Sequence, residues 1–403
     1  MTNSALIVDD DPMMQIISAA ALRSAGVETV EVASNGSSAL ANIRSAKQQL
    51  DLVVSDLNMP DLDGLQFLRL LSDQGYEGNI IIASGEDDVV LKAAMDMAGA
   101  MGLSLVGALK KPVTPERLIA LVSKANSEHR SQRSHAAPPI KAIDVRNAID
   151  RREITPFFQP KFHVDTGEVV GVEALARWNS PVHGQIAPDI FVKIAEDADL
   201  ISDLTFLMLD RSLEMLSRLR PNGSPISVAI NTDSTTINDA TFPDIAVERC
   251  QAYGVPNSSV TFEITERNLL DEKASSIEVL ARLRMLKFGV SVDDFGTGHT
   301  NLRQLCVYPF TELKIDRSFL KGAMTDRRHL VCLRAMAKLG KDLDMSIVAE
   351  GIETEKDVVL LQEIGVDSMQ GYYLKRPVPA DEFLAWYLTY LKHRGRRASA
   401  ASA

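Results

Sequence analysis

Short apolar runs alternate with segments of helical periodicity along residues 1–125 of the chain. Five of the runs have the length and composition of buried strands: ALIVDD, ETVEVA, LDLVVSD, GNIIIAS and LSLVGAL. The segments between them, such as MMQIISAAALRSAG, repeat their apolar residues with the period of a helix. This alternation predicts an α/β domain, a doubly wound parallel sheet with helices on both faces.

A second alternation of strands and helices occupies residues 144–392. Its eight strand candidates are PFFQPKF, VVGVEALARW, PISVAIN, SVTFEITE, FGVSVDDFG, FTELKID, SIVAEG and DSMQGYYL. Helical segments separate most of them. Eight strand–helix units in about 250 residues predict a TIM-like barrel, whose reactive groups project from the carboxyl ends of the strands.

A polar stretch divides the two halves. Residues 127–142 read SEHRSQRSHAAPPIKA, which has no apolar period and contains a Pro-Pro pair. This composition indicates a linker, which we place at residues 126–143, or the frayed end of a connecting helix. The last ten residues, RGRRASAASA, are small and polar, and we expect residues 393–403 to be a disordered tail.

Composition and net charge limit the classes of protein to which this chain could belong. The 403 residues, 45% hydrophobic and 24% charged, are typical of two globular domains. A net charge of −11 argues against a duplex DNA partner held by non-specific electrostatics. Three widely spaced cysteines fit a reducing cytosol. The chain has neither a basic, apolar leader nor a long apolar run. We therefore expect a cytoplasmic protein without membrane insertion.

Acidic and polar residues follow the strands of the first domain. Asp9 and Asp10 end the first strand, Asp56 the third and Ser84 the fourth, and Lys111 follows the fifth. These positions meet at one edge of a parallel sheet. Three carboxylates that close together need a counterion, and Mg²⁺ is the natural one. A carboxylate beside Mg²⁺ can attack a phosphoryl group, whose oxygens Lys111 and Ser84 would contact.

The motifs VDDD, SDLNMPDLDG and KKP resemble those of the response-regulator receiver family, over roughly residues 1–125. The resemblance implies a flavodoxin-like fold with Asp56 as phospho-acceptor. Asp10 and the backbone carbonyl of Asn58 would complete the Mg²⁺ site, assisted by Asp9. A sensor histidine kinase or phosphotransfer protein is the implied partner. Ala108 stands where the family usually has an aromatic switch residue, so we expect a different or weak readout. A receiver kept only as a dimerisation module is the alternative.

Polar residues also stand at or near the ends of all eight barrel strands. They are Gln159, Glu173, Asn231, Glu263, Glu266, Asp293, Asp294, Lys314, Asp316, Glu350 and Gln370. Carboxylates from several strands converge only around positive charge. Oxygen ligands without a Cys or His cluster favour Mg²⁺ or Mn²⁺ over Zn²⁺. The adjacent pair Asp293-Asp294 suits two metals, an arrangement typical of phosphodiester hydrolysis. The glycines of DFGTG predict a mobile or tightly turned loop.

The motifs EALARW, AINTDS, EITE, DDFGTG, LKID, AEGIE and QGYYLKRP resemble, in order, those of the EAL-domain phosphodiesterases, which linearise cyclic di-GMP to pGpG. The resemblance spans about residues 145–392. It implies that the first metal is held by Glu173, Asn231, Glu263 and Asp293. Asp293 and Asp294 would serve a second metal.

The same resemblance implies roles for the remaining residues. Lys314 would lie near the attacking water, and Glu350 would act as general base or only orient the water. Positions near substrate or metal-bound water are Gln159, Leu175, Arg177, Asp316 and Gln370, with Arg177 suited to bidentate phosphate binding. Glu266 would anchor the glycine loop, and Glu353 would support it. His299 replaces the family's usual Tyr, and we favour a surface or loop-packing role over metal ligation.

These observations favour a metal-dependent cyclic di-GMP phosphodiesterase that is regulated by phosphorylation of Asp56. The catalytic reading rests on the retention of Glu173 and of the Asp293-Asp294 pair. A non-catalytic barrel that binds cyclic di-GMP as an effector, or a scaffold acting through the receiver, is the alternative. Both families imply self-association, with a dimer as the minimum. No helix-turn-helix or basic segment follows the barrel, which argues against DNA binding.

Overall fold

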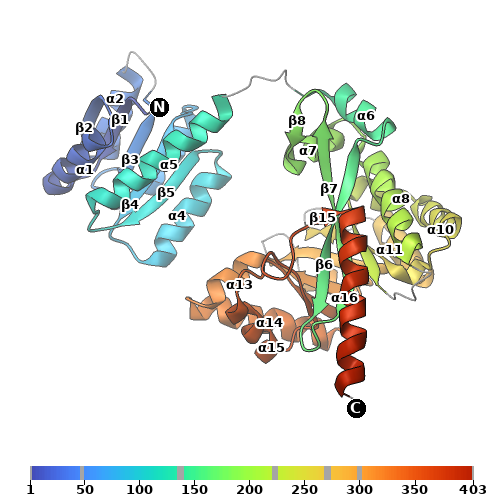
Figure 1. Ribbon diagram of the computed structural model, residues 1–403. Helices are drawn as coiled ribbons and strands as arrows, with labels where there is room; N and C mark the ends of the chain where they lie inside the picture. Colours follow the sequence, from blue (N-terminus) through green and yellow to red (C-terminus); the bar gives the residue numbers. More distant parts are fainter. Residues whose placement is uncertain are drawn as a thin grey trace. The chain divides into compact units, whose positions relative to one another are not determined.

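The computed structural model describes residues 2–45, 50–133, 140–219, 226–266, 274–296 and 302–401 (Figure 1). The chain divides into two compact units, Met1–Ala136 and Ala137–Ala403. Each unit has its own hydrophobic core.

The first unit is a parallel five-stranded sheet of order β2-β1-β3-β4-β5. Its elements are β1 (Ser4–Val8), α1 (Pro12–Ser24), β2 (Thr29–Ala33), α2 (Gly36–Ser45), β3 (Leu52–Asp56), α3 (Gly64–Asp73), β4 (Asn79–Ser84), α4 (Asp88–Ala100), β5 (Ser104–Lys110) and α5 (Pro115–Arg133). Helices α1 and α5 pack on one face, and α2, α3 and α4 pack on the other. The prediction of a doubly wound, flavodoxin-like domain is confirmed, because this strand order is the one typical of that fold.

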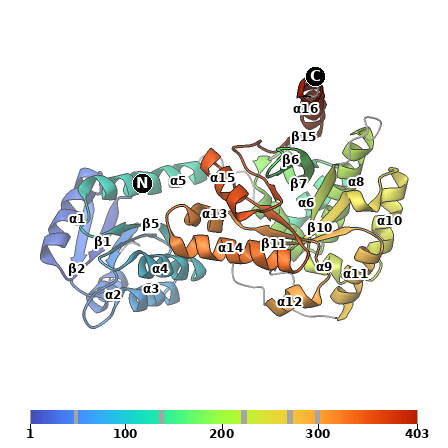
Figure 2. The same ribbon diagram turned by 90° about the horizontal axis from the view of Figure 1, so that it is seen from below.

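The second unit is a closed barrel surrounded by helices, as Figure 2 shows. The barrel strands are β6 (Ile154–His163), β7 (Val169–Ser180), β9 (Ser227–Thr232), β10 (Val260–Thr265), β11 (Gly289–Phe295), β12 (Glu312–Ile315), β13 (Ser346–Ala349) and β14 (Ser368–Met369). All eight predicted strands are present. They pair in the order β6-β14-β13-β12-β11-β10-β9-β7, and a pairing between β7 and β6 closes the ring. Two short strands, β8 (Gly184–Ile186) and β15 (Val378–Pro379), pair with β7 and β6 respectively.

Helices connect most of the barrel strands and also precede and follow the barrel in the chain. They are α6 (Ala142–Asp150), α7 (Pro188–Asp197), α8 (Ile201–Leu219), α9 (Ser234–Ile237), α10 (Phe242–Ala252), α11 (Ala274–Met285), α12 (Leu302–Val307), α13 (Arg317–Ala323), α14 (Arg327–Asp342), α15 (Glu355–Ile364) and α16 (Ala380–Ala401), with the short 3₁₀ helix η2 (Asn257–Ser259). Strand β10 shows how the core forms: Phe262 packs outward on Phe242 and Phe288, while the next residue, Glu263, faces the interior.

One strand differs from the expected strand–helix units. Strand β6 runs antiparallel to both of its neighbours, β7 and β14. Only residues 164–168 separate β6 from β7, and a connection this short can join antiparallel strands but cannot make a parallel crossover. The first unit of the barrel is therefore a hairpin.

The described residues also include the segments at the ends of the units. Helix α5 continues to Arg133, which agrees with the predicted alternative of a connecting helix, and α6 begins at Ala142. Helix α16 continues to Ala401, through the expected disordered tail. The tail is rich in Ala and Arg, which have high helix propensity, and extending an existing helix costs far less than starting one. In the described part of the chain, no helix combines the length and apolar character needed to cross a membrane.

Candidate active site

The carboxyl edge of the receiver sheet gathers the predicted acids. Asp9, Asp10 and Asp56 each offer an oxygen within 4.8 Å of the others. The Nζ atom of Lys111 lies 2.8 Å from Asp9 Oδ2 and 2.6 Å from Asp56 Oδ2. Burial raises the pKa of Asp9, and hydrogen bonding to Lys111 opposes that rise. A cluster of three carboxylates, two of which share one lysine, suits a divalent cation.

Other predicted receiver residues lie around this cluster. The backbone N–H of Asn58 donates to Asp56 Oδ1 over 3.1 Å. Ser84 is buried at the end of β4, and its Oγ accepts from the backbone N–H of Glu86. Ala108 lies on β5 beside Ile82 and packs on the core beneath α2, α3 and α4. The side chain of Ala108 is a methyl group, so no aromatic ring can rotate at this position.

In the barrel, Lys314 is the centre of a second cluster. Its Nζ atom lies 2.8 Å from Glu350 Oε1, 3.0 Å from both Glu263 Oε2 and Asp293 Oδ1, and 3.4 Å from Glu173 Oε2. These residues come from β7, β10, β11, β12 and the end of β13. Lys314 is only 1% exposed. The barrel therefore brings four carboxylates from separate strands onto one buried ammonium group.

Two amide side chains complete this cluster. The Nε2 atom of Gln370 donates to Glu173 Oε2 at 2.5 Å and to Glu350 Oε1 at 2.9 Å. Asn231 Nδ2 lies 3.4 Å from Glu173 Oε1. Gln370 Oε1 is buried and has no hydrogen-bond partner within the described ranges. An orphaned acceptor beside these carboxylates is consistent with a further polar ligand or ion at the site.

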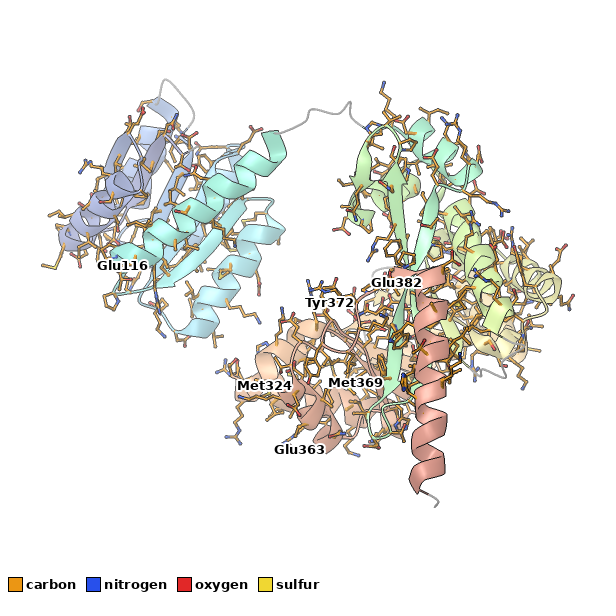
Figure 3. The ribbon with its side chains drawn as sticks, viewed as in Figure 1. Glu116, Met324, Glu363, Met369, Tyr372 and Glu382 are labelled. Carbon is orange, nitrogen blue, oxygen red and sulfur yellow. The ribbon has the colours of Figure 1, made fainter. Side chains whose placement is uncertain are left out.

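Close packing of two strand ends brings Glu350 and Gln370 together. Gln370 follows Met369, the last residue of β14, which is labelled with Tyr372 in Figure 3. The next residue, Gly371, lies so close to the Ile352 backbone that a Cβ atom would come within 2.2 Å of Ile352 N. Only glycine permits this approach, because any side chain would push the ends of β13 and β14 apart.

An irregularity in β11 turns two neighbouring carboxylates toward the same place. Successive residues of a strand normally face opposite sides of the sheet. Asp294, however, has a φ of 54°, and the pairing of β11 with β12 shifts between Val292 and Phe295. As a result, Asp293, Asp294 and Glu350 offer oxygens within 4.8 Å of one another. This oxygen-rich set fits a hard divalent cation.

The pKa values show an excess of negative charge. Burial raises the pKa of Glu350 well above its usual value and raises that of Glu173, and Lys314 only partly offsets both shifts. Burial and the neighbouring Asp293 raise the pKa of Asp294 to about 6. Burial would also raise the pKa of Glu263, but Lys161 and Lys314 hold it at about 2. Buried carboxylates that lack enough positive charge are what a bound cation would stabilise.

A cavity of about 940 Å³ adjoins these residues. Its lining includes the predicted Leu175, Arg177, Asn231, Glu266, Asp294 and Asp316. Apolar residues of α7 and α8 form another wall, together with the acids Asp189 and Glu196; this wall was not predicted. The guanidinium of Arg177 donates to the Ala176 carbonyl and lies 5.9 Å from the Phe157 ring centroid. Gln159 pairs with Glu173 across β6 and β7, and its Nε2 lies 3.4 Å from the Lys375 carbonyl oxygen.

The two predicted loop supports differ. Glu266 is buried, and its Oε1 accepts from the backbone N–H of Gly296 at 2.8 Å. Glu353 is half exposed, and its carboxylate pairs with Lys321 of α13 at 2.9 Å. Its support of the glycine loop stays a prediction. His299 and most of the glycine loop lie outside the described residues.

Sequence reasoning missed Lys161. This lysine is 4% exposed, and its Nζ atom lies 2.9 Å from Glu263 Oε1 and 3.0 Å from Glu312 Oε1. Its spacing in the sequence could have identified it. Lys161 follows Gln159 by two residues on β6, so both side chains face the same side of the strand.

Comparisons with known proteins cover both units. The sequence matches the EAL domain over residues 143–377 and the response regulator receiver domain over residues 5–123. The cyclic di-GMP phosphodiesterase RocR of Pseudomonas aeruginosa is 32% identical over 381 residues, which cover 94% of this chain and 97% of RocR.

Solved structures resemble the barrel. The PaMucR phosphodiesterase in complex with c-di-GMP matches with a TM-score of 0.57 and 33% identity, over 60% of this chain and 98% of that one. An EAL domain protein from Listeria monocytogenes matches with a TM-score of 0.55 and 28% identity, over 63% of this chain and all of that one. On these matches, the chain belongs to the EAL domain family and carries a response regulator receiver domain ahead of its barrel.

Proposed function

We propose that the chain is a response regulator that hydrolyses cyclic di-GMP to linear pGpG with bound divalent metal. The observation that carries the proposal is the set of four carboxylates around Lys314, beside a cavity of about 940 Å³. A cavity of this size lies within the range of about 300–1,000 Å³ that is usual for small-molecule sites. The similarity to RocR along nearly the whole chain supports the same substrate.

Glu173, Asn231, Glu263 and Asp293 would hold the first ion, and Asp293 with Asp294 the second; we propose Mg²⁺ or Mn²⁺. Bound there, such ions would neutralise the phosphodiester and lower the pKa of water. The protein residues then have separate tasks. Glu350, with its raised pKa, is suited to take the proton of the attacking water. Gln370 orients Glu350 through the hydrogen bond to Oε1. Arg177, which lines the cavity, would bind phosphate.

In this reaction, water attacks phosphorus and the bond from phosphorus to one ribose O3′ breaks. The 3′ oxygen leaves with a proton, and the phosphate stays on the 5′ oxygen of the other nucleoside. Lys314, whose Nζ atom contacts Asp293 and Glu350, would stabilise the extra negative charge of the transition state.

The test is incubation of the full chain with cyclic di-GMP and Mg²⁺ or Mn²⁺, followed by chromatography for pGpG. We expect product with metal and none with a chelator. A protein that binds the dinucleotide but forms no pGpG with either metal would instead be a non-catalytic effector, and the proposed activity would be wrong.

We further propose that Asp56 accepts a phosphoryl group from a histidine kinase or phosphotransfer protein, with Mg²⁺ held by the receiver acids. Lys111, which contacts Asp9 and Asp56, would then stabilise the phosphoryl oxygens.

We also propose a homo-oligomer, at least a dimer. Cys250, Cys306 and Cys332 are all free thiols, which supports a reducing compartment such as the cytoplasm.

Removing the phospho-acceptor should uncouple the two units. Beryllofluoride or acetyl phosphate should change the turnover of the wild type by about 5-fold or more, a typical size for allosteric coupling. Asp56→Ala should abolish that change without altering basal turnover. The exposed Asp73 at the end of α3 provides a matched control, and Asp73→Ala should respond like the wild type. An equal response in Asp56→Ala would rule out regulation through this residue.

A further inference from the structure

A buried lysine spans the inside of the barrel below the Lys314 cluster. Lys161 extends from β6, and its Nζ atom contacts Glu263 of β10 and Glu312 of β12. Strand β11, which lies between β10 and β12, is the strand opposite β6 in the ring. Lys161 therefore bridges the two sides of the barrel.

The Lys161 ammonium lies at a level of the barrel where two glutamates flank a small residue. Glu263, Ser291 and Glu312 are in register on three adjacent strands, so they lie at one level of the barrel. The middle residue is small and fully buried, and the Ser291 Oγ has no hydrogen-bond partner in the described part of the structure. A larger residue at this position would occupy the space between the two glutamates, where the ammonium lies.

The two carboxylate oxygens of Glu263 contact two different lysines. Its Oε1 atom lies 2.9 Å from Lys161, and its Oε2 atom lies 3.0 Å from Lys314. The contact with Lys161 directs Oε1 toward the level of Ser291 and Glu312. The second oxygen faces the cluster that also contains Glu173 and Asp293. With both oxygens held, the Glu263 carboxylate has one fixed orientation.

We propose that Lys161 is a positioning residue for the first metal, an inference that rests on the proposed metal-dependent function. Its contact with Oε1 fixes the orientation of the Glu263 carboxylate, so that Oε2 is presented as a single, preorganised metal donor. Residues that contact a metal ligand, but not the metal itself, typically contribute about 10- to 100-fold to metal affinity. Glu312 is the second carboxylate that contacts the Lys161 ammonium, and among the contacts of the described residues it touches none of the proposed ligands.

Mn²⁺ affinity of the full chain, measured by calorimetry or electron paramagnetic resonance without substrate, tests this inference. All variants carry Asp10→Ala and Asp56→Ala, which remove two of the three receiver carboxylates from the titration. We expect Lys161→Met to weaken Mn²⁺ binding by about 10- to 100-fold. Lys161→Gln, which keeps a hydrogen-bond donor but no charge, should be intermediate. Glu312→Gln removes a partner from the same layer and should bind Mn²⁺ like the parent.

Circular dichroism and thermal unfolding in chelator establish that each variant is folded. Should Lys161→Met fail to fold, Lys161→Gln decides the question. Parent-like affinity in the folded Lys161 variants would overturn the inference, as would an equal loss in Glu312→Gln, which would indicate a purely structural layer. These outcomes leave the proposed function intact. A parent protein that binds no Mn²⁺ would instead overturn the metal-dependent function itself.

Discussion

Glu350→Gln should lower the turnover of cyclic di-GMP by about 10²- to 10⁴-fold, the usual contribution of a general base. Glu350 Oε1 lies between Lys314 Nζ at 2.8 Å and Gln370 Nε2 at 2.9 Å. A glutamine oxygen can accept both hydrogen bonds, so the substitution preserves the geometry. It removes the negative charge of the side chain and, with it, the capacity to take a proton from water.

Rate and binding must be measured separately for this variant. Dinucleotide affinity in the presence of Ca²⁺, an ion with slow or no turnover in a site built for a smaller cation, should stay close to that of the wild type. The exposed Glu363 of α15 offers a matched control, and Glu363→Gln should keep full turnover. Near-normal turnover of Glu350→Gln would show that Glu350 only orients the water.

Lys314→Met should destabilise the metal-free barrel by about 3 to 5 kcal/mol, the typical cost of removing one partner of a buried ion pair. Methionine fills a similar volume but leaves the carboxylates of Glu173, Glu263, Asp293 and Glu350 without their shared cation. Mn²⁺ should restore part of the lost stability, because it supplies positive charge at the same place. Turnover should remain low even with the metal.

Tryptophan fluorescence reports this unfolding specifically. The chain has two tryptophans, Trp178 and Trp386, and both belong to the barrel unit. Denaturation should be followed in chelator and again with Mn²⁺. Lys338→Met, on the exposed face of α14, is the matched control. If Lys314→Met unfolds at the same denaturant concentration as this control, the lysine does not stabilise the cluster.

The strand-end residues of both sites could be located from sequence, because topology fixes where they lie. Parallel strands bring their carboxyl ends to one edge, so the carboxylates of β7, β10 and β11 had to meet. Spacing also indicated which residues share a face. Glu263 and Phe262 are neighbours in the chain, and alternation alone places them on opposite sides of β10.

Features that depend on distant packing could not be predicted in the same way. Lys161 was overlooked because its partners Glu263 and Glu312 come from strands across the barrel, and no local pattern links them. The pair of Glu353 and Lys321 could not be predicted either, because Lys321 lies on a helix 32 positions earlier in the chain. The cavity wall formed by α7 and α8 depends on how two helices pack, which the apolar period of either helix does not specify.

The antiparallel β6 sets the order in which the active site can assemble. The β6–β7 hairpin places Gln159 beside Glu173 through a turn of a few residues, so this contact has a small loop-closure cost. Gln370 must reach the same Glu173 across 197 positions of sequence, and it does so only when β14 pairs with β6 and the ring closes. Long-range pairing of this kind is slow to form. During synthesis, therefore, a chain that has not yet completed β14 has the hairpin but lacks the assembled site, and the protein cannot degrade its signal before its last barrel strand is in place.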